Sequence, residues 1–79
     1  MAGSLTILDS ATEAVGSFSS PIMMRIFCKT SGNIVITGPN LYNASVVATS
    51  LTVAMTTGQE IEAELTGAVH STGKYYVMW

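Results

Sequence analysis

Residues 41–57, LYNASVVATSLTVAMTT, decide the fold of this chain, because two different periodicities fit them. Asn40 or Asn43 can cap the start of a helix here, and Gly58 is suited to its end. Seventeen residues are long for a strand but ordinary for a helix. A helix would place six apolar side chains on one stripe: Ala44, Val47, Ala48, Leu51, Ala54 and Met55.

The same stretch also fits a strand. Val47, Thr49, Leu51, Val53 and Met55 alternate with other residues, and seven β-branched side chains favour extended backbone. We predict a helix over 41–57 on the grounds of length and capping. If the segment is a strand instead, the chain becomes an all-β sandwich.

The residues before this stretch predict strands. Ile22–Thr30 alternates clearly, with Ile22, Met24, Ile26 and Cys28 on the core face. Ser31-Gly32-Asn33 indicates a turn, and Ile34–Thr37 is the expected return strand of a hairpin.

The N-terminal part is less regular. Ser4–Leu8 predicts a short strand with Leu5 and Ile7 on one face. Ala11–Ser20 is ambiguous, and Gly16 indicates a bulge or bend if that segment is extended.

Two more strands are expected after the helix. Glu60–Thr66 alternates strictly, and its three glutamates face away from the core. Gly67–Gly73 has the composition of a loop, and Tyr75–Trp79 closes the chain as a strand. The expected fold is therefore one domain over residues 1–79. It is mainly β with one helix, in a small OB-like barrel of five or six strands.

Composition points to self-association. Charged residues make up 10% of the 79 residues, against about 25% in an average domain. Cys28 is the single cysteine, so no internal disulfide can stabilise so short a chain. We therefore predict a homo-oligomer. Three basic residues and a net charge of −2 make nucleic-acid binding an unfavoured function.

Neither a membrane span nor a signal peptide is expected. The longest mostly apolar stretch, Ala44–Met55, is too short to cross a bilayer as a helix. Met1–Ser4 lacks the charged start of a signal peptide. The expectation is a cytosolic protein, a virion-associated protein or the mature form of a secreted one.

The order of these elements resembles the B subunits of bacterial toxins of the Shiga and cholera type. The resemblance covers about residues 22–79: residues 43–65 look like the helix-then-strand core, and residues 69–78 like the final loop and strand. It implies an OB barrel, a homopentameric ring with helices lining a central channel, and carbohydrate binding on one face. Those subunits usually carry an internal disulfide, which Cys28 cannot form here, and no sugar-binding residue of the family has a match in this chain.

Two sets of residues are candidates for a subunit interface. The helix face opposite the core stripe would carry only uncharged residues: Val46, Ser50, Val53 and Thr57. Such a face suits close contact between helices, although an exposed Ser/Thr-rich surface would look the same. In a ring, Arg25 and Lys29 could also pair with Glu62 and its neighbouring glutamates on the next subunit.

The sequence contains no recognisable catalytic or metal-binding pattern. His70 is the single histidine, and no second His or Cys is available to complete a site with it. We therefore expect no enzyme activity and no cofactor. Two functions remain: an oligomeric module that binds a glycan or another surface ligand, and a structural or assembly protein, for example of a phage particle.

Overall fold

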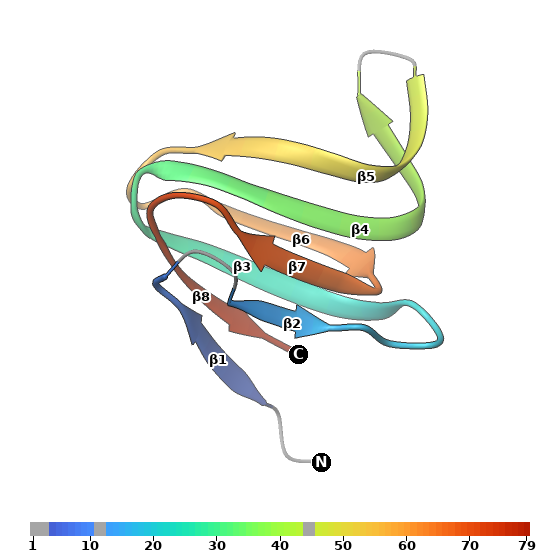
Figure 1. Cartoon of the computed structure of the whole chain (residues 1–79), viewed down its shortest axis with the longest axis horizontal. Coiled ribbons are helices and arrows are strands. Elements are labelled where there is room, and N and C mark those ends of the chain that lie inside the picture. The colour runs from blue at the N-terminus through green and yellow to red at the C-terminus, as the bar shows by residue number, and fades with distance from the viewer. Residues whose placement is uncertain (1–3, 11–12, 44–45) are drawn as a thin grey trace.

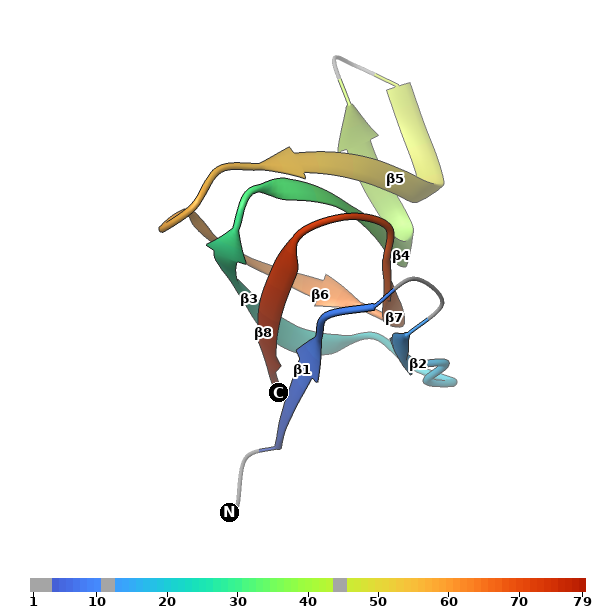
Figure 2. The same ribbon diagram turned by 60° about the vertical axis from the view of Figure 1, so that its left-hand side comes forward.

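A computed structural model describes residues 4–10, 13–43 and 46–79; at residues 40, 42–43 and 46–48 it describes the backbone alone. The chain forms two four-stranded antiparallel sheets (Figures 1 and 2). The first sheet has the order β1-β8-β3-β6 and the second β2-β7-β4-β5. The strands are β1 (Leu5–Leu8), β2 (Ala14–Gly16), β3 (Ile22–Thr30), β4 (Gly32–Asn43), β5 (Val46–Met55), β6 (Glu60–Leu65), β7 (Gly67–His70) and β8 (Lys74–Met78).

The mainly β class predicted from the sequence is confirmed, but the helix over 41–57 is wrong. The described part of this segment is the end of β4 and the whole of β5, which pair as an antiparallel hairpin. Residues 44–45 lie outside the described residues. The β-branched side chains were the correct signal here, since β4 supplies a partner for every described residue from Val46 to Val53 except Thr49.

The predicted hairpin at Ser31–Asn33 is also wrong. β3 and β4 are separated by Ser31 alone, yet they belong to different sheets. Gly32 lies so close to the backbone of Thr72 and Gly73 that a Cβ atom would overlap it. The chain therefore crosses from the first sheet to the second at this point. As a result, Cys28 and Ile34 point into the same core from opposite sheets.

Two further predictions need correction. Gly67–Gly73 is not entirely a loop, because β7 occupies its first four residues and pairs with both β2 and β4. Eight strands are found in the described residues instead of five or six. Small side chains explain the missed strand: Gly67 and Ala68 are buried, and an added Cβ at Gly67 would lie 2.8 Å from the carbonyl oxygen of Val15.

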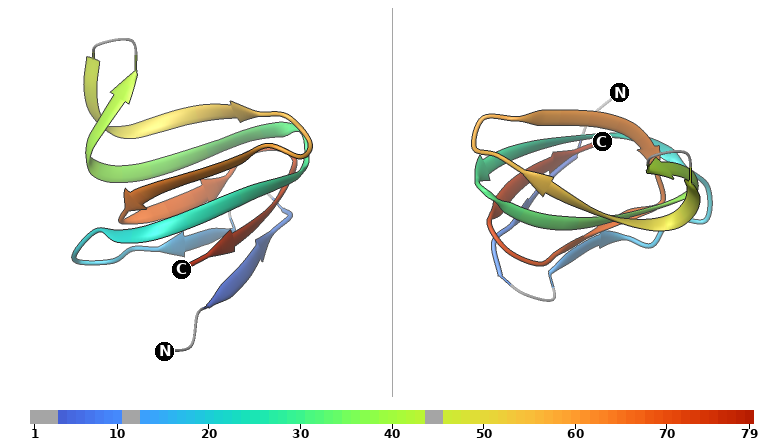
Figure 3. Two further views of the ribbon diagram at one scale, coloured as in Figure 1. Left: turned by 180° about the vertical axis from the view of Figure 1, so that it is seen from behind. Right: turned by 90° about the horizontal axis from the view of Figure 1, so that it is seen from above.

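The core lies between the two sheets, whose ribbons surround a common interior in the view from above in Figure 3. The inward side chains of β3 and β8 are fully buried except for Ile22, which is partly buried at the start of β3, so the alternation in the sequence predicts the core face. They meet side chains from the opposite sheet in one apolar cluster: Leu8, Val15, Met24, Ile26, Cys28, Ile34, Ile36, Leu41, Met55, Leu65, Ala68, Tyr75 and Val77.

A reciprocal set of hydrogen bonds joins two of the corners between the sheets. The backbone N–H of Ser31 donates to Thr57 Oγ1 at 3.1 Å, and the N–H of Thr57 donates to Ser31 Oγ at 2.9 Å. The two hydroxyls are also 3.1 Å apart. Gly58 N–H, on the same turn, donates to the carbonyl of Cys28. This Ser31–Thr57 clasp fixes the β3–β4 corner against the β5–β6 turn.

The clasp generates a prediction about stability. Ser31→Ala and Thr57→Val should each lower the free energy of unfolding by roughly 0.5–1.5 kcal/mol, since each removes hydrogen bonds at an exposed site. The double variant should lose less than the sum, because both changes break the same set of bonds. Urea unfolding measures all three, with Ser71→Ala in another exposed corner as the control. Strict additivity would contradict the clasp.

Candidate functional site

The outer face of the first sheet is the most unusual surface of the molecule. Antiparallel register aligns the outward residues of four strands in two rows. One row is Leu5, Met78, Arg25 and Glu62, and the other is Ile7, Tyr76, Phe27 and Glu60. Met23 lies opposite Glu64 at one end of the face. We call these nine residues and Glu64 the outer face.

The outer face is apolar over β1, β8 and half of β3. Leu5 is 61% exposed, Ile7 47% and Met23 54%. Phe27 and Tyr76 stack on each other, with ring centroids 6.1 Å apart. The sequence places Leu5 and Ile7 together on one face, and the structure turns that face outward, while Leu8 points into the core. A monomeric protein rarely leaves so many large apolar side chains together in water.

The charged groups of the outer face lie on its other half. Arg25 Nη2 is 3.3 Å from Glu62 Oε2, and Arg25 Nε is 3.8 Å from Glu60 Oε2. These side chains are about half exposed, so the pairs contribute little to stability. The two ion pairs instead hold the Arg25 guanidinium over β6 and keep the carboxylates of Glu60 and Glu62 away from the apolar half of the outer face.

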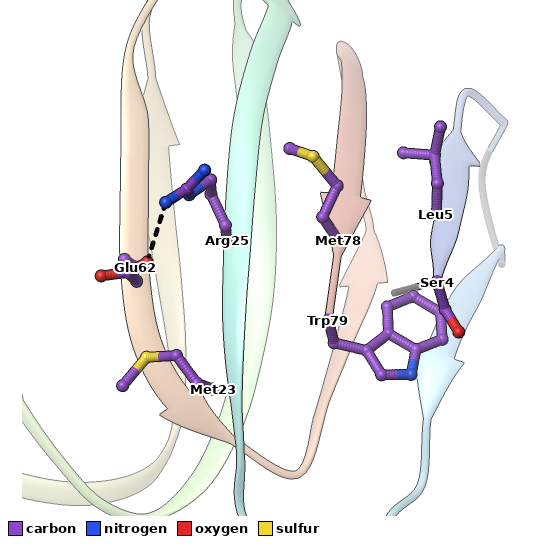
Figure 4. Close-up of a pocket in the computed structure, with 7 residues that line it drawn as sticks. All are labelled: Ser4, Leu5, Met23, Arg25, Glu62, Met78 and Trp79. Carbon is purple, nitrogen blue, oxygen red and sulfur yellow. Dashed lines mark hydrogen bonds and ion pairs between the residues drawn. The ribbon is translucent and has the colours of Figure 1, made fainter. Parts of the chain in front are cut away.

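One end of the outer face is hollowed into a shallow pocket of about 400 Å³ (Figure 4). Leu5 and Met78 line one side of it, and the Arg25–Glu62 pair lines the other. Trp79 closes the end beside Ser4, and its ring packs against Phe18 with a centroid distance of 5.9 Å. The pocket thus combines thioether, aromatic and ionic groups within one open site.

The residues predicted for a subunit interface do not gather on one surface. Ser50 is exposed on β5, whereas Val53 packs against the core and Thr57 belongs to the clasp. The side chain of Val46 lies outside the described residues. Arg25 and Glu62 are brought together, but as partners within one chain. The apolar half of the outer face was not predicted from the sequence. The alternation of side chains in β1 and β8 locates it only when the pairing of these two strands is known.

The reactive side chains are buried away from this site. Cys28 is fully buried, its thiol donates to the carbonyl of Thr30 at 3.2 Å, and burial raises the thiol pKa. Burial also raises the pKa of Tyr75, with a smaller contribution from Cys28, and its hydroxyl donates to the carbonyl of Thr72 at 2.7 Å. Both groups therefore stay protonated at neutral pH.

His70 also faces inward. Its Nε2 lies 2.7 Å from the carbonyl oxygen of Gly73, which can only accept, so Nε2 carries the proton. Its ring meets the edge of Tyr75, and Nδ1 has no hydrogen-bond partner among the described residues. The backbone N–H of His70 donates to the carbonyl of Glu13, whose carboxylate accepts from the N–H groups of Asp9 and Ser10. Those two bonds lower the pKa of Glu13.

In the described ranges, no three His, Cys, Asp or Glu side chains come close enough together to hold a metal ion. The same residues contain no helix long and apolar enough to cross a membrane. Comparisons with protein-family models, curated proteins and solved structures found no match for this chain. The function is therefore inferred from the geometry of this chain.

The burial of Cys28 leads to a prediction about its reactivity. An aromatic disulfide reagent at pH 8 should modify Cys28 no faster than the protein unfolds, because attack needs an exposed thiolate. Adding urea should release one reactive thiol per chain. Cys28→Ser combined with Ser19→Cys is the control, since it moves the thiol to an exposed position. Immediate reaction of Cys28 in the native protein would contradict the buried thiol.

Proposed function

We propose that this chain is a non-catalytic assembly module that works as a homo-oligomer, in which a second copy covers the outer face. The observation that carries this proposal is the exposed apolar half of that face, formed by Leu5, Ile7, Met23 and their neighbours on β8. Burying such side chains is the main source of free energy in protein association.

The size of the chain favours a second copy as the partner. A single core in fewer than about 80 residues rarely supplies more than about 3–5 kcal/mol. This chain has 79 residues, and its one cysteine is a buried free thiol. An isologous contact would extend the buried surface of both copies at once.

The chemistry of the outer face also suits protein contact. Methionine side chains adapt to irregular surfaces, and Met23 and Met78 flank the pocket. The Phe27–Tyr76 pair supplies rigid aromatic area beside them. Since the carboxylates stand on β6, at the edge of the sheet, the apolar half can be covered without burying them.

The same proposal holds that the chain has no catalytic activity. It is supported by the protonated, buried state of Cys28 and Tyr75 and by the inward position of His70. A nucleophile or general base must reach a bound substrate, and none of these three side chains lines the pocket. Glu62, the carboxylate that does line it, is paired with Arg25.

Substitutions at the two most exposed apolar residues of the outer face test the assembly role. Leu5→Glu/Met23→Glu should lower the native mass measured by light scattering after size exclusion, because four carboxylates would enter each face-to-face contact. The strand signal in circular dichroism should be unchanged, since both side chains are already exposed.

Val69→Glu is the matched control. Val69 is an apolar residue on β7 that is 37% exposed on the second sheet, away from the outer face. This variant should keep the wild-type mass. If the double variant has the same mass as the wild type, the outer face is not the interface.

A second candidate function is recognition of a glycan in the pocket, with the chain acting as an oligomeric binding module like the toxin B subunits. The specific observation that favours it is that an indole and a guanidinium–carboxylate pair line the same open space of about 400 Å³. Aromatic rings can stack on a sugar ring, and charged groups can hydrogen-bond its hydroxyls.

The fluorescence of Trp79, the single tryptophan, reports directly on this pocket. Titration with a panel of neutral and sialylated oligosaccharides should shift its emission if a glycan binds. Arg25→Gln should then weaken binding by about tenfold or more, since a charge-assisted hydrogen bond is lost. Lys29→Gln, which changes a cation on the same strand outside the pocket, should not. A flat titration with every member of the panel argues against this second function.

A further inference from the structure

A second surface is available at the free edge of β5. The sheet order places β5 at the border of the second sheet, where β4 is its only strand partner among the described residues. Figures 1 and 3 show no strand beyond it. The backbone N–H and C=O groups on that side of Val46–Met55 therefore lack a strand to bond with.

The other three edge strands are short or charged, and β5 is neither. β1 has four residues and β2 has three, while β6 carries Glu60, Glu62 and Glu64 on its outward side. β5 has ten residues, VVATSLTVAM, with no charge, proline or glycine. Natural proteins usually protect an edge of this length with such residues.

The side chains at this edge favour pairing of β5 with another strand. Leu51 and Val53 point toward the core but stay partly exposed, because no strand covers their far side. Ser50, Thr52 and Ala54 are exposed on the opposite side and are small. A neighbouring strand would complete the apolar row on one side and add hydroxyl contacts on the other.

We propose that β5 pairs antiparallel with β5 of a second copy, which joins the two second sheets into one continuous sheet. A second β5 fits because the strand carries no charge, so two identical edges can approach each other without repulsion between like charges. Antiparallel pairing of identical strands also forms a closed two-fold contact, in which both edges are satisfied together.

This edge contact is distinct from the outer face, which belongs to the first sheet. It goes beyond the proposed assembly role because it adds a second kind of contact to each chain. Two different two-fold contacts on one chain allow assemblies larger than a dimer.

The experiment isolates the edge by starting from Leu5→Glu/Met23→Glu, in which the outer face is blocked. We expect this chain to have twice the mass of 8.3 kDa in light scattering, held by the edge alone. Adding Ser50→Lys/Thr52→Lys should halve that mass, and adding Ser50→Glu/Thr52→Glu should do the same, since like charges then meet across the edge. Mixing the lysine and glutamate chains in equal amounts should restore the dimer.

The neutral exchange Ser50→Thr/Thr52→Ser is the matched control and should keep the dimer. A blocked-face chain that is monomeric at every concentration overturns the edge contact, as does a lysine variant that stays dimeric. A monomeric blocked-face chain that nevertheless takes up a peptide of unrelated sequence along β5 overturns self-pairing in favour of a foreign strand. The assembly role through the outer face fails on a different result, namely an unchanged mass when Leu5 and Met23 are replaced in the wild type.

Discussion

The alternation of side chains in β3 constrains the rest of the structure. Met24, Ile26 and Cys28 are fully buried between the sheets, so the residues between them must point to the other side. Because β8 and β6 pair with β3, and β1 pairs in turn with β8, the same constraint applies across the first sheet. Burying Val77 and Tyr75 turns Met78 and Tyr76 outward, and burying Leu8 turns Ile7 outward. The strand pairing that builds the core therefore also determines which residues form the outer face. What needs an explanation is that so many of these residues are apolar.

The connections between strands explain how so short a chain builds two sheets. β4 and β5 form a hairpin, but each of the other six connections between consecutive strands carries the chain from one sheet to the other. Each crossing brings an edge of one sheet close to the other, and hydrogen bonds at the corners hold them there. Thr66 N–H donates to the carbonyl of Thr37, and the Ser31–Thr57 clasp joins another corner. Hydroxyl groups take part at both corners, since Thr66 Oγ1 also donates to Thr37 Oγ1 at 3.3 Å.

Local pattern predicted much of the first sheet and little of the second. Ile22–Thr30 and the strand beginning at Glu60 were found from strict alternation, since one side of each faces the core and the other faces water. The helix over 41–57 was wrong because length and end residues outweighed β-branching, and the long partner strand β4 could not be seen in advance. Gly32 was predicted as a turn residue, but it is the first residue of β4, because nothing local distinguishes a hairpin from a crossing between sheets. The outer face could not be predicted either, because it depends on which strands become neighbours. The toxin-like resemblance and the pentameric ring stay predictions, and the helix on which their element order relied is not found among the described residues.

The chain has two candidate contact surfaces, the outer face of the first sheet and the edge of β5. Both arise because the sequence contains few charged residues. The central claim is that the chain is incomplete without further copies of itself. Sedimentation equilibrium of the unmodified protein over a hundredfold range of concentration tests this claim directly. We predict a mass that is a multiple of 8.3 kDa, with dissociation at most at the lowest concentrations. A single folded species of 8.3 kDa at the highest concentration, with its full strand signal in circular dichroism, would contradict it.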